Sequence, residues 1–327
     1  MIKDKKRNVK WAIGIDIGGT KIEAALIDKK GKVHDRYRIA TKSISGYRSV
    51  LKHLITVVNA ISTKNKLKEY VVGIGVAGQI TKETGVIKYS PNLNWHNVKL
   101  KQDLSKIIKQ PVYICNDVRA ATFCEWNFGA GKGCDDLVCV FVGTGIGGGI
   151  VSGGHILEGS NNTAGEIGHM TIDIHGPKCH CNNTGCFEAL AGGWAIARDA
   201  QNMVSKNRTQ GKTLLHIAKG KINNINAKTV YEGLRQHDPL SKQLVDDLKK
   251  NLIAGMVSIV NAFGPKVLIL GGGIIEGFPM LLPAIKKGIK KNALSVAAAS
   301  LKVVPAKLHN DSGAIGAASF AFHELKR

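Results

Sequence analysis

Near its start the chain reads Trp11-Ala-Ile-Gly-Ile-Asp16-Ile-Gly18-Gly19-Thr20-Lys21-Ile-Glu-Ala-Ala-Leu-Ile-Asp28. About 125 residues later it reads Leu137-Val-Cys-Val-Phe-Val-Gly143-Thr144-Gly145-Ile-Gly-Gly-Gly-Ile-Val151. Each stretch is an apolar β-rich run, a polar glycine turn and a second apolar run, which predicts two similar hairpins. Two similar halves that face each other across a cleft would place both turns at one ligand.

Other parts of the chain predict further strands and helices around these hairpins. A third apolar strand over residues 266–270 ends in Gly271, Gly272 and Gly273. Residues 49–61 are amphipathic, and a second helix is predicted from Pro239, where apolar residues recur at four-residue spacing until Gly264. Strands that alternate with helices indicate an α/β fold with mixed sheets. We expect two domains, one of residues 1–116 with 306–327 and one of residues 117–305.

The composition fits a folded protein of a reducing compartment. At 327 residues, of which 44% are apolar, the chain can bury a large core in two domains. No apolar run approaches the roughly 18–20 residues of a membrane-spanning helix, and the charged residues 1–10 do not resemble a signal peptide. The seven cysteines favour a reducing compartment, so we expect a cytoplasmic protein that has no membrane partner.

The net charge of +22 raises the alternative of a polyanionic partner, either nucleic acid or polyphosphate. The basic residues, however, are mostly lysines and are spread along the whole chain. A nucleic-acid reader usually carries an arginine-bearing stripe or a recognisable module, and the sequence has neither. We therefore expect a solvated basic surface and no nucleic-acid partner.

The first glycine turn, Asp16-x-Gly18-Gly19-Thr20-Lys21, has the chemistry of a phosphate loop. Glycines let the backbone wrap around a phosphate, and Thr20 and the backbone can donate hydrogen bonds to it. The Asp16 carboxylate can hold Mg²⁺, through water. An ordinary hairpin turn with a surface lysine would show the same pattern, so the turn alone leaves both interpretations open.

The second turn, with Gly143, Thr144 and Gly145, matches the spacing of a dinucleotide-binding fingerprint through Gly148. That fingerprint opens a helix, whereas the residues that follow this turn have no helical periodicity. A Walker A loop is also absent from the sequence. A phosphate held by two hairpin turns is the better interpretation.

Asn116 and Asp117 follow an apolar run and precede a helical segment. Asn and Asp are favoured at a helix N-cap, which is the simpler interpretation of the pair. A carboxylate at the junction between a strand and a helix can also accept a proton from a hydroxyl nucleophile. Both can hold together.

A cysteine cluster predicts a metal site. Cys179, Cys181 and Cys186, with His169 ten residues upstream, form a Cys₃His set. The alternative is a group of buried free thiols, but the other four cysteines are scattered without such spacing. We expect a closed, structural Zn²⁺ site with no open position for catalysis.

These residues resemble the ROK family of sugar kinases and repressors, within the actin-like ATPase superfamily and its ribonuclease H-like fold. The resemblance runs from Ile13 to about Phe320. Its most specific part is Gly165-Glu166-Ile167-Gly168-His169, followed by the cysteine cluster and Glu188. The fold it implies is α/β, with two domains of mixed sheets around a central cleft.

The resemblance also implies a role for individual residues. Asp117 would be the catalytic base. The first phosphate loop would comprise Asp16, Gly18, Gly19, Thr20 and Lys21, the second Gly143, Thr144 and Gly145, and the adenosine would be bordered by Gly271, Gly272 and Gly273. The sugar hydroxyls would be bound by Asn92, Asn116, Glu166, His169 and Glu188, with Gly78 lining the sugar loop. The zinc ligands would be His169, Cys179, Cys181 and Cys186.

The activity that the resemblance implies is phosphorylation of a hexose by ATP with Mg²⁺, with Zn²⁺ as a structural ion. Residues 90–95 and 188–198 are most similar to the glucokinases of the family, which implies transfer to the 6-hydroxyl of glucose. Family members are often dimers or tetramers, so we expect a homo-oligomer. N-acetylglucosamine, N-acetylmannosamine and fructose remain alternative substrates, and polyphosphate is an alternative donor.

Two non-enzymatic alternatives are weaker. Repressors of the family carry a helix-turn-helix domain before the first phosphate loop, whereas ten residues precede Trp11 in this sequence. A non-catalytic sugar sensor would not need the carboxylate of Asp117.

The sequence departs from the family pattern at two positions. Asn182 stands where the family usually has glycine after the second cysteine, and the sugar loop reads Gly75-Val76-Ala77-Gly78 where Gly-x-Pro-Gly is common. Neither change removes the expected base or a metal ligand. The loop change leaves the choice of hexose open.

Overall fold

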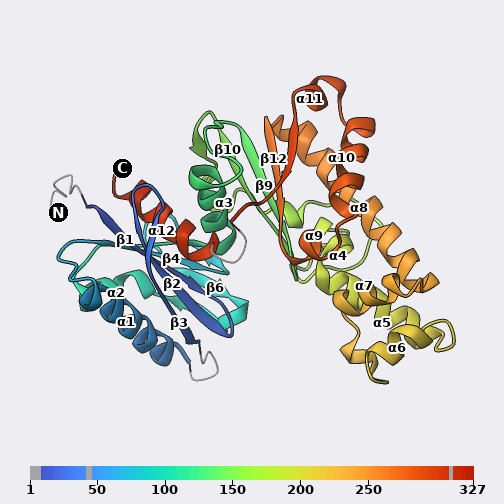
Figure 1. Cartoon of the computed structure of the whole chain (residues 1–327), viewed down its shortest axis with the longest axis horizontal. Helices are drawn as coiled ribbons and strands as arrows, with labels where there is room; N and C mark the ends of the chain where they lie inside the picture. The colour runs from blue at the N-terminus through green and yellow to red at the C-terminus, as the bar shows by residue number, and fades with distance from the viewer. Residues whose placement is uncertain (1–8, 42–45, 309–311) are drawn as a thin grey trace. The chain divides into compact units, whose positions relative to one another are not determined.

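The computed structural model describes residues 9–41, 46–308 and 312–327 (Figure 1). The chain divides into two compact units. Unit 1 comprises Met1–Gly133, Leu157–Ala164 and Lys307–Arg327, and unit 2 comprises Cys134–Ile156 and Gly165–Ala306. Each unit has its own sheet and its own hydrophobic core.

Unit 1 is built on a five-stranded mixed sheet. Its strands are β1 (Trp11–Ile17), β2 (Lys21–Asp28), β3 (Val33–Ala40), β4 (Val71–Val76) and β8 (Val112–Asn116), in the order β3-β2-β1-β4-β8. The pairs β1–β2 and β2–β3 are antiparallel, whereas β4 pairs in parallel with both β1 and β8. The hairpin predicted for residues 11–28 is thus confirmed.

Helices cover both faces of this sheet (Figure 1). Ile13 and Ile15 point to one face, where they pack with Leu54 and Val58 of α1 (Gly46–Lys64) and with residues of α2 (Leu100–Ile108). Alternate residues point to the other face, where α12 (Ser312–Glu324) packs with Ala12. A small sheet of β5 (Gln79–Ile80), β6 (Ile87–Ser90) and β7 (Trp95–Val98), with the short helix η2 (Pro91–Leu93), completes the unit.

Unit 2 repeats the sheet arrangement of unit 1. Its strands are β9 (Leu137–Val142), β10 (Ile146–Ser152), β11 (His155–Ile156), β12 (Val267–Gly271) and β13 (Lys302–Pro305), in the order β11-β10-β9-β12-β13. As in unit 1, an antiparallel hairpin is followed across the sheet by two parallel strands. This order confirms the second hairpin and the internal repeat.

The long helix α8 (Pro239–Phe263) is the centre of the unit 2 core. Asp238 caps its N-terminus, because its Oδ2 accepts a hydrogen bond from the Ser241 amide at 2.8 Å. The helix ends where Gly264 adopts a left-handed conformation with φ 52°. Both ends agree with the sequence prediction.

Shorter helices lie near α8 in unit 2 (Figure 1). They are η3 (Ile167–His169), α4 (Phe187–Ala191), α5 (Gly193–Lys206), α6 (Lys212–Ile217), η4 (Ile222–Asn224), α7 (Ala227–Arg235), α9 (Gly273–Gly277), α10 (Leu281–Asn292) and α11 (Ser295–Ala299). The helices α4 and α5 follow the cysteine cluster directly in the sequence.

The helix α3 (Asp117–Phe128) belongs to unit 1, although the expected boundary at residue 117 placed it in the second domain. It packs against α12 so closely that a Cβ added at Gly316 would lie 1.8 Å from the Ala120 carbonyl oxygen. The buried Glu125 carboxylate also accepts hydrogen bonds from the amides of Lys307 and Leu308, both at 2.8 Å. These contacts bind α3 to the C-terminal part of the chain.

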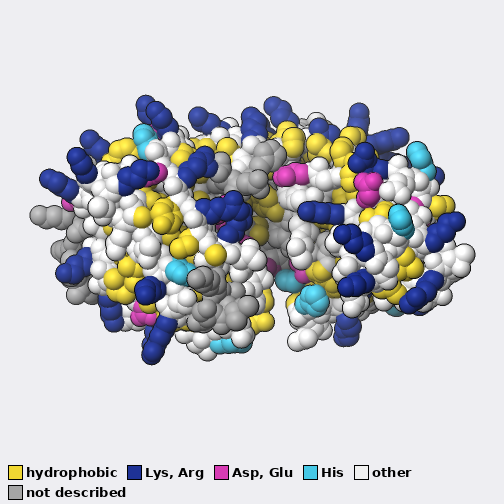
Figure 2. Space-filling view, turned by 60° about the horizontal axis from the view of Figure 1, so that its bottom comes forward, with side chains coloured by type: hydrophobic (Ala, Val, Ile, Leu, Met, Phe, Trp, Pro, Cys, Tyr) yellow, Lys and Arg dark blue, Asp and Glu magenta, His cyan; other side chains and the backbone are white. Residues whose placement is uncertain are grey.

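Two further properties concern the charged side chains and the apolar character of the helices. On the face shown in Figure 2, Lys and Arg side chains are scattered rather than gathered in one stripe. Among the described residues, no helix has both the length and the apolar character that crossing a membrane requires.

The close packing of α12 on the sheet gives a first prediction. A Cβ at Gly73, on β4, would lie 1.8 Å from the Ala317 carbonyl oxygen, so Gly73→Ala forces the backbone apart. We expect a loss of about 3 kcal/mol in the free energy of unfolding, measured by urea denaturation. The matched control is Gly277→Ala, where the added Cβ meets no atom within 4 Å. Equal stability of the two variants would contradict the packing described for α12.

Candidate active site

The first glycine turn is held in shape by hydrogen bonds within unit 1. The Gly18 amide donates to the Lys21 carbonyl at 2.9 Å, as the hairpin turn requires. The buried Thr41, which is not part of the turn, also stabilises it. Its Oγ1 donates to the Gly18 carbonyl at 2.6 Å, and its amide donates to the Thr20 carbonyl at 2.9 Å. Thr41 was missed in the sequence, because nothing in its local pattern relates it to a turn twenty residues earlier.

Two carboxylates meet at the end of β1. Burial, the nearby Asp117 and then Glu23 raise the pKa of Asp16 to about 7, while Lys21 opposes the shift. Neighbouring buried carboxylates repel one another, and a cation bound beside them relieves that cost. Carboxylate oxygens are also the ligands that Mg²⁺ prefers. The chemistry of this pair therefore fits a magnesium ion.

Asn116 and Asp117 lie at the junction between β8 and α3. Asn116 is the N-cap, and its Oδ1 accepts hydrogen bonds from the amides of Val118 at 2.9 Å and Arg119 at 3.3 Å. The predicted cap is thus confirmed. Asp117 Oδ1 also accepts from the Val118 amide at 3.0 Å, which fixes the carboxylate. Burial raises the pKa of Asp117, and a raised pKa makes its carboxylate a better proton acceptor.

Gly78 and Asn92 belong to the same part of unit 1. Asn116 Nδ2 donates to the Gly78 carbonyl at 3.4 Å. Gly78 has a φ of +154°, and an added Cβ would lie 2.4 Å from the Tyr89 carbonyl oxygen, so this position requires glycine. A Cβ at Gly19 would lie 3.4 Å from the Asn92 carbonyl oxygen, which places Asn92 beside the first turn.

The second glycine turn, between β9 and β10, is held by the start of α5. The Gly143 amide donates to the Gly145 carbonyl at 2.9 Å within the turn. From α5, the Gly193 amide donates to the Gly143 carbonyl at 2.9 Å and the Trp194 amide donates to the Thr144 carbonyl at 3.0 Å. The turn carbonyls are thus occupied by protein donors.

Glu188, at the start of α4, also binds this turn. Its Oε2 accepts a hydrogen bond from the Ile146 amide at 2.7 Å, and its Oε1 accepts one from Trp194 Nε1 at 3.2 Å. A Cβ at Gly145 would lie 2.2 Å from Oε2, so the carboxylate fits against the turn because residue 145 is glycine. The sequence analysis predicted Glu188 as a sugar ligand, but it predicted neither of these contacts and did not single out Trp194.

The glycines after β12 lie beside the second turn. Gly271 pairs with Phe141 in the sheet, because β12 is the parallel neighbour of β9. Gly272 has a φ of 92°, and an added Cβ would lie 2.5 Å from the Val142 carbonyl oxygen. Gly273 then begins α9. The structure therefore brings the second glycine turn and the glycines expected to border the adenosine together in unit 2.

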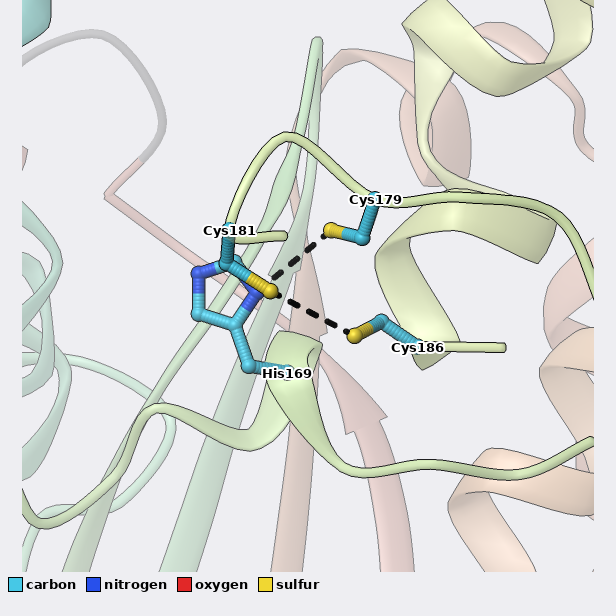
Figure 3. A group of neighbouring side chains, drawn as sticks. All are labelled: His169, Cys179, Cys181 and Cys186. Carbon is cyan, nitrogen blue, oxygen red and sulfur yellow. Dashed lines mark hydrogen bonds between the residues drawn. The ribbon is translucent and has the colours of Figure 1, made fainter. Parts of the chain in front are cut away.

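The Cys₃His set forms one cluster in unit 2 (Figure 3). The candidate ligand atoms of His169, Cys179, Cys181 and Cys186 all lie within 4.8 Å of one another. Cys179 Sγ lies 3.8 Å from His169 Nδ1, and Cys181 Sγ lies 3.6 Å from Cys186 Sγ. A tetrahedral Zn²⁺ with bonds of ~2.3 Å separates its sulfur ligands by about 3.8 Å. The donor set and its spacing therefore fit zinc.

The backbone conformation of Asn182 explains why asparagine fits where the family usually has glycine. Asn182 adopts a left-handed conformation with φ 71°. Asn is among the few residues besides glycine that adopt this conformation readily, so it can replace the usual glycine here.

Glu166 and His169 are placed together by the short helix η3. The His169 amide donates to the Glu166 carbonyl at 3.0 Å. Gly168, between them, packs against β10, where an added Cβ would lie 2.0 Å from the Ile146 carbonyl oxygen. Backbone contacts thus connect the cysteine cluster to the strand that follows the second turn.

The expected site residues therefore form two groups, one in each unit. Unit 1 carries the first phosphate turn with Asp16, the sugar-loop residues and Asp117. Unit 2 carries the second turn, the glycines after β12, the cysteine cluster and the remaining sugar ligands.

Comparison with known proteins identifies the family. The model of the ROK family matches residues 12–324. The chain belongs to the ROK family. It is 31% identical over 308 residues to the glucokinase of Thermotoga maritima, covering 94% of this chain and 96% of the relative. It is also 30% identical to the xylose repressor of Bacillus subtilis, covering 94% of this chain and 76% of the repressor.

A solved structure gives the same result for the fold. The chain is similar to a ROK family glucokinase from Streptomyces griseus, crystallised in complex with glucose and AMPPNP. The TM-score is 0.79 at 30% identity, with 96% of this chain and 99% of the other covered. The two mixed sheets and this likeness agree with the expected actin-like ATPase fold.

The contacts of Glu188 give a second prediction. In Glu188→Gln an amide NH₂ replaces one carboxylate oxygen and faces an N–H donor. We expect a loss of about 1–3 kcal/mol in the free energy of unfolding of the protein without ligands, measured by urea denaturation. The control is Glu83→Gln, at an exposed position of unit 1. If both variants were as stable as the unchanged protein, Glu188 would not hold the turn.

Proposed function

We propose that the protein is an ATP-dependent glucokinase that transfers the γ-phosphoryl group of ATP to the 6-hydroxyl of glucose. Its membership of the ROK family and its likeness to glucokinases over nearly the whole chain support this function. The observation that carries it is the placement of Asp117: a buried carboxylate with a raised pKa, fixed at the start of α3 and near Asp16, which precedes the first glycine turn.

In this proposal Asp117 accepts the proton of the sugar hydroxyl as the hydroxyl oxygen attacks the γ-phosphorus. The phosphorus–oxygen bond to ADP breaks, and glucose 6-phosphate and ADP are the products. Its raised pKa favours proton uptake, and its hydrogen bond to the Val118 amide holds the carboxylate still. The remaining sugar hydroxyls would be bound by Asn92, Asn116, Glu166, His169 and Glu188, with Gly78 giving the sugar room.

The two glycine turns would bind the phosphates of ATP. Their residues are Gly18, Gly19, Thr20 and Lys21 in unit 1 and Gly143, Thr144 and Gly145 in unit 2. Phosphoryl transfer depends mainly on positioning and charge neutralisation, which rigid turns with backbone donors supply. Asp16 would hold Mg²⁺, which offsets the charge of the triphosphate when bound. Gly271, Gly272 and Gly273 would border the adenosine.

His169, Cys179, Cys181 and Cys186 would hold Zn²⁺ as a structural ion. Four protein ligands leave no open position for a substrate, so this ion would stabilise the loop before α4 rather than act on ATP. The seven cysteines are all free thiols, which is consistent with the reducing conditions of the cytoplasm. The family resemblance further supports a homo-oligomer.

The role of Asp117 gives a third prediction. Asp117→Asn preserves the shape of the side chain but removes the proton acceptor. We expect glucose phosphorylation to slow by about 10²–10⁴-fold with no loss of thermal stability, because the substitution also removes the repulsion between Asp117 and Asp16. Activity is measured by transfer of γ-labelled phosphate from ATP to glucose. Asp247→Asn, on the surface of α8, should retain full activity. A fully active Asp117→Asn would eliminate the proposed base.

The cysteine cluster gives a fourth prediction. We expect one zinc ion per chain in the purified protein, measured by plasma mass spectrometry, and almost none in Cys181→Ser. The control is Cys134→Ser, because Cys134 lies outside the cluster and its Sγ donates to the nearby Asp136 carbonyl at 3.2 Å, a contact that serine can also make. Zinc-free protein with normal activity and stability would contradict the structural role.

A further inference from the structure

Trp194 lies at the start of α5, between the cysteine loop (residues 179–186) and the second glycine turn. Its indole ring stacks on the imidazole of His180, with ring centroids 4.1 Å apart and planes at 26°. The guanidinium carbon of Arg198 also lies over the indole, 5.1 Å from its centre. The ring is therefore held by residues of both the loop and the helix.

Hydrogen bonds hold the Arg198 guanidinium in place over the indole ring. Asp199 accepts two hydrogen bonds from the guanidinium, at 2.8 and 3.0 Å, and the Ala189 carbonyl accepts a third at 3.0 Å. A guanidinium fixed by three hydrogen bonds has little freedom to move, so it limits the motion of the indole beneath it.

Trp194 contacts the second glycine turn by two routes. Its backbone amide donates to the Thr144 carbonyl at 3.0 Å. Its indole Nε1 donates to Glu188 Oε1 at 3.2 Å, and Glu188 Oε2 accepts from the Ile146 amide at 2.7 Å. A carboxylate with one donor on each oxygen has a single orientation, whereas a carboxylate with one donor can rotate.

We propose that Trp194 is a positioning residue, which fixes the Glu188 carboxylate against the second phosphate turn and so connects the sugar ligand to the nucleotide site. This inference rests on the proposed function for the roles of Glu188 and the turn. Loss of the indole N–H donor would free the carboxylate, and both sugar and nucleotide would then bind a less ordered site.

If Trp194 served only to pack against its neighbours, its substitution would have a different effect. The indole packs against a small cluster of Cys179, Cys186 and Ala189. If packing were its whole contribution, a ring without the N–H group would serve as well. Trp194→Phe keeps an aromatic ring beside His180 and Arg198 and removes the donor, so it separates the two roles.

The test compares Trp194→Phe with the unchanged protein and with Trp11→Phe. Trp11 is the control because it is the first residue of β1, whereas the first glycine turn follows the other end of that strand. Affinity for Mg-AMPPNP is measured by titration calorimetry, glucose KM and kcat by ADP release, and zinc by mass spectrometry. We expect Trp194→Phe to weaken Mg-AMPPNP binding and raise the glucose KM, each by about tenfold, and to keep its zinc and its thermal midpoint. Trp11→Phe should match the unchanged protein.

Two results would overturn the inference. Trp194→Phe with normal nucleotide affinity and normal KM would show that the indole N–H positions nothing. A variant that loses zinc and stability along with affinity would show that Trp194 acts by packing. If the unchanged protein and Trp11→Phe both failed to phosphorylate glucose, the proposed function would fail instead. The nucleotide titration needs no sugar, so it would still decide the role of Trp194.

Discussion

The proposed phosphate site depends on one constraint: the backbone of each glycine turn is held in a fixed shape by hydrogen bonds from the rest of its unit. In unit 1 that support comes from Thr41, which binds the carbonyls of Gly18 and Thr20. In unit 2 it comes from the start of α5 and from the Glu188 carboxylate. Similar hairpins in the two sheets are thus held by unrelated residues.

The sequence was sufficient for features that depend on neighbouring residues. Both hairpins, the α8 boundaries at Asp238 and Gly264, the Asn116 cap and the cysteine spacing follow from local patterns, and the structure agrees with each. Contacts between distant segments could not be predicted in this way. Thr41 and Trp194 carry no local signal, and α3 joins unit 1 through its packing against a helix almost 200 residues later.

The same distinction between local sequence and long-range contacts applies to the residues of the candidate site. The family resemblance predicts roles for Asp117 and Glu188 from their positions in the sequence, but the environment of each side chain comes from the fold. Burial raises the pKa of Asp117, and Glu188 binds the turn because Gly145 leaves room for it. Ala77, where the sequence departs from the family pattern, lies next to Gly78, where a φ of +154° and the nearby Tyr89 carbonyl require glycine.

The central claim is that this protein uses ATP to phosphorylate glucose. The most direct measurement is ADP release with Mg-ATP and a panel of glucose, fructose, N-acetylglucosamine and N-acetylmannosamine, with glucose and polyphosphate assayed separately for glucose 6-phosphate. We expect the highest kcat/KM for glucose with ATP, and little product with polyphosphate. A clear preference for an acetylated sugar would contradict the substrate, and phosphorylation by polyphosphate alone would contradict the donor. No turnover of any sugar would contradict the enzymatic function itself.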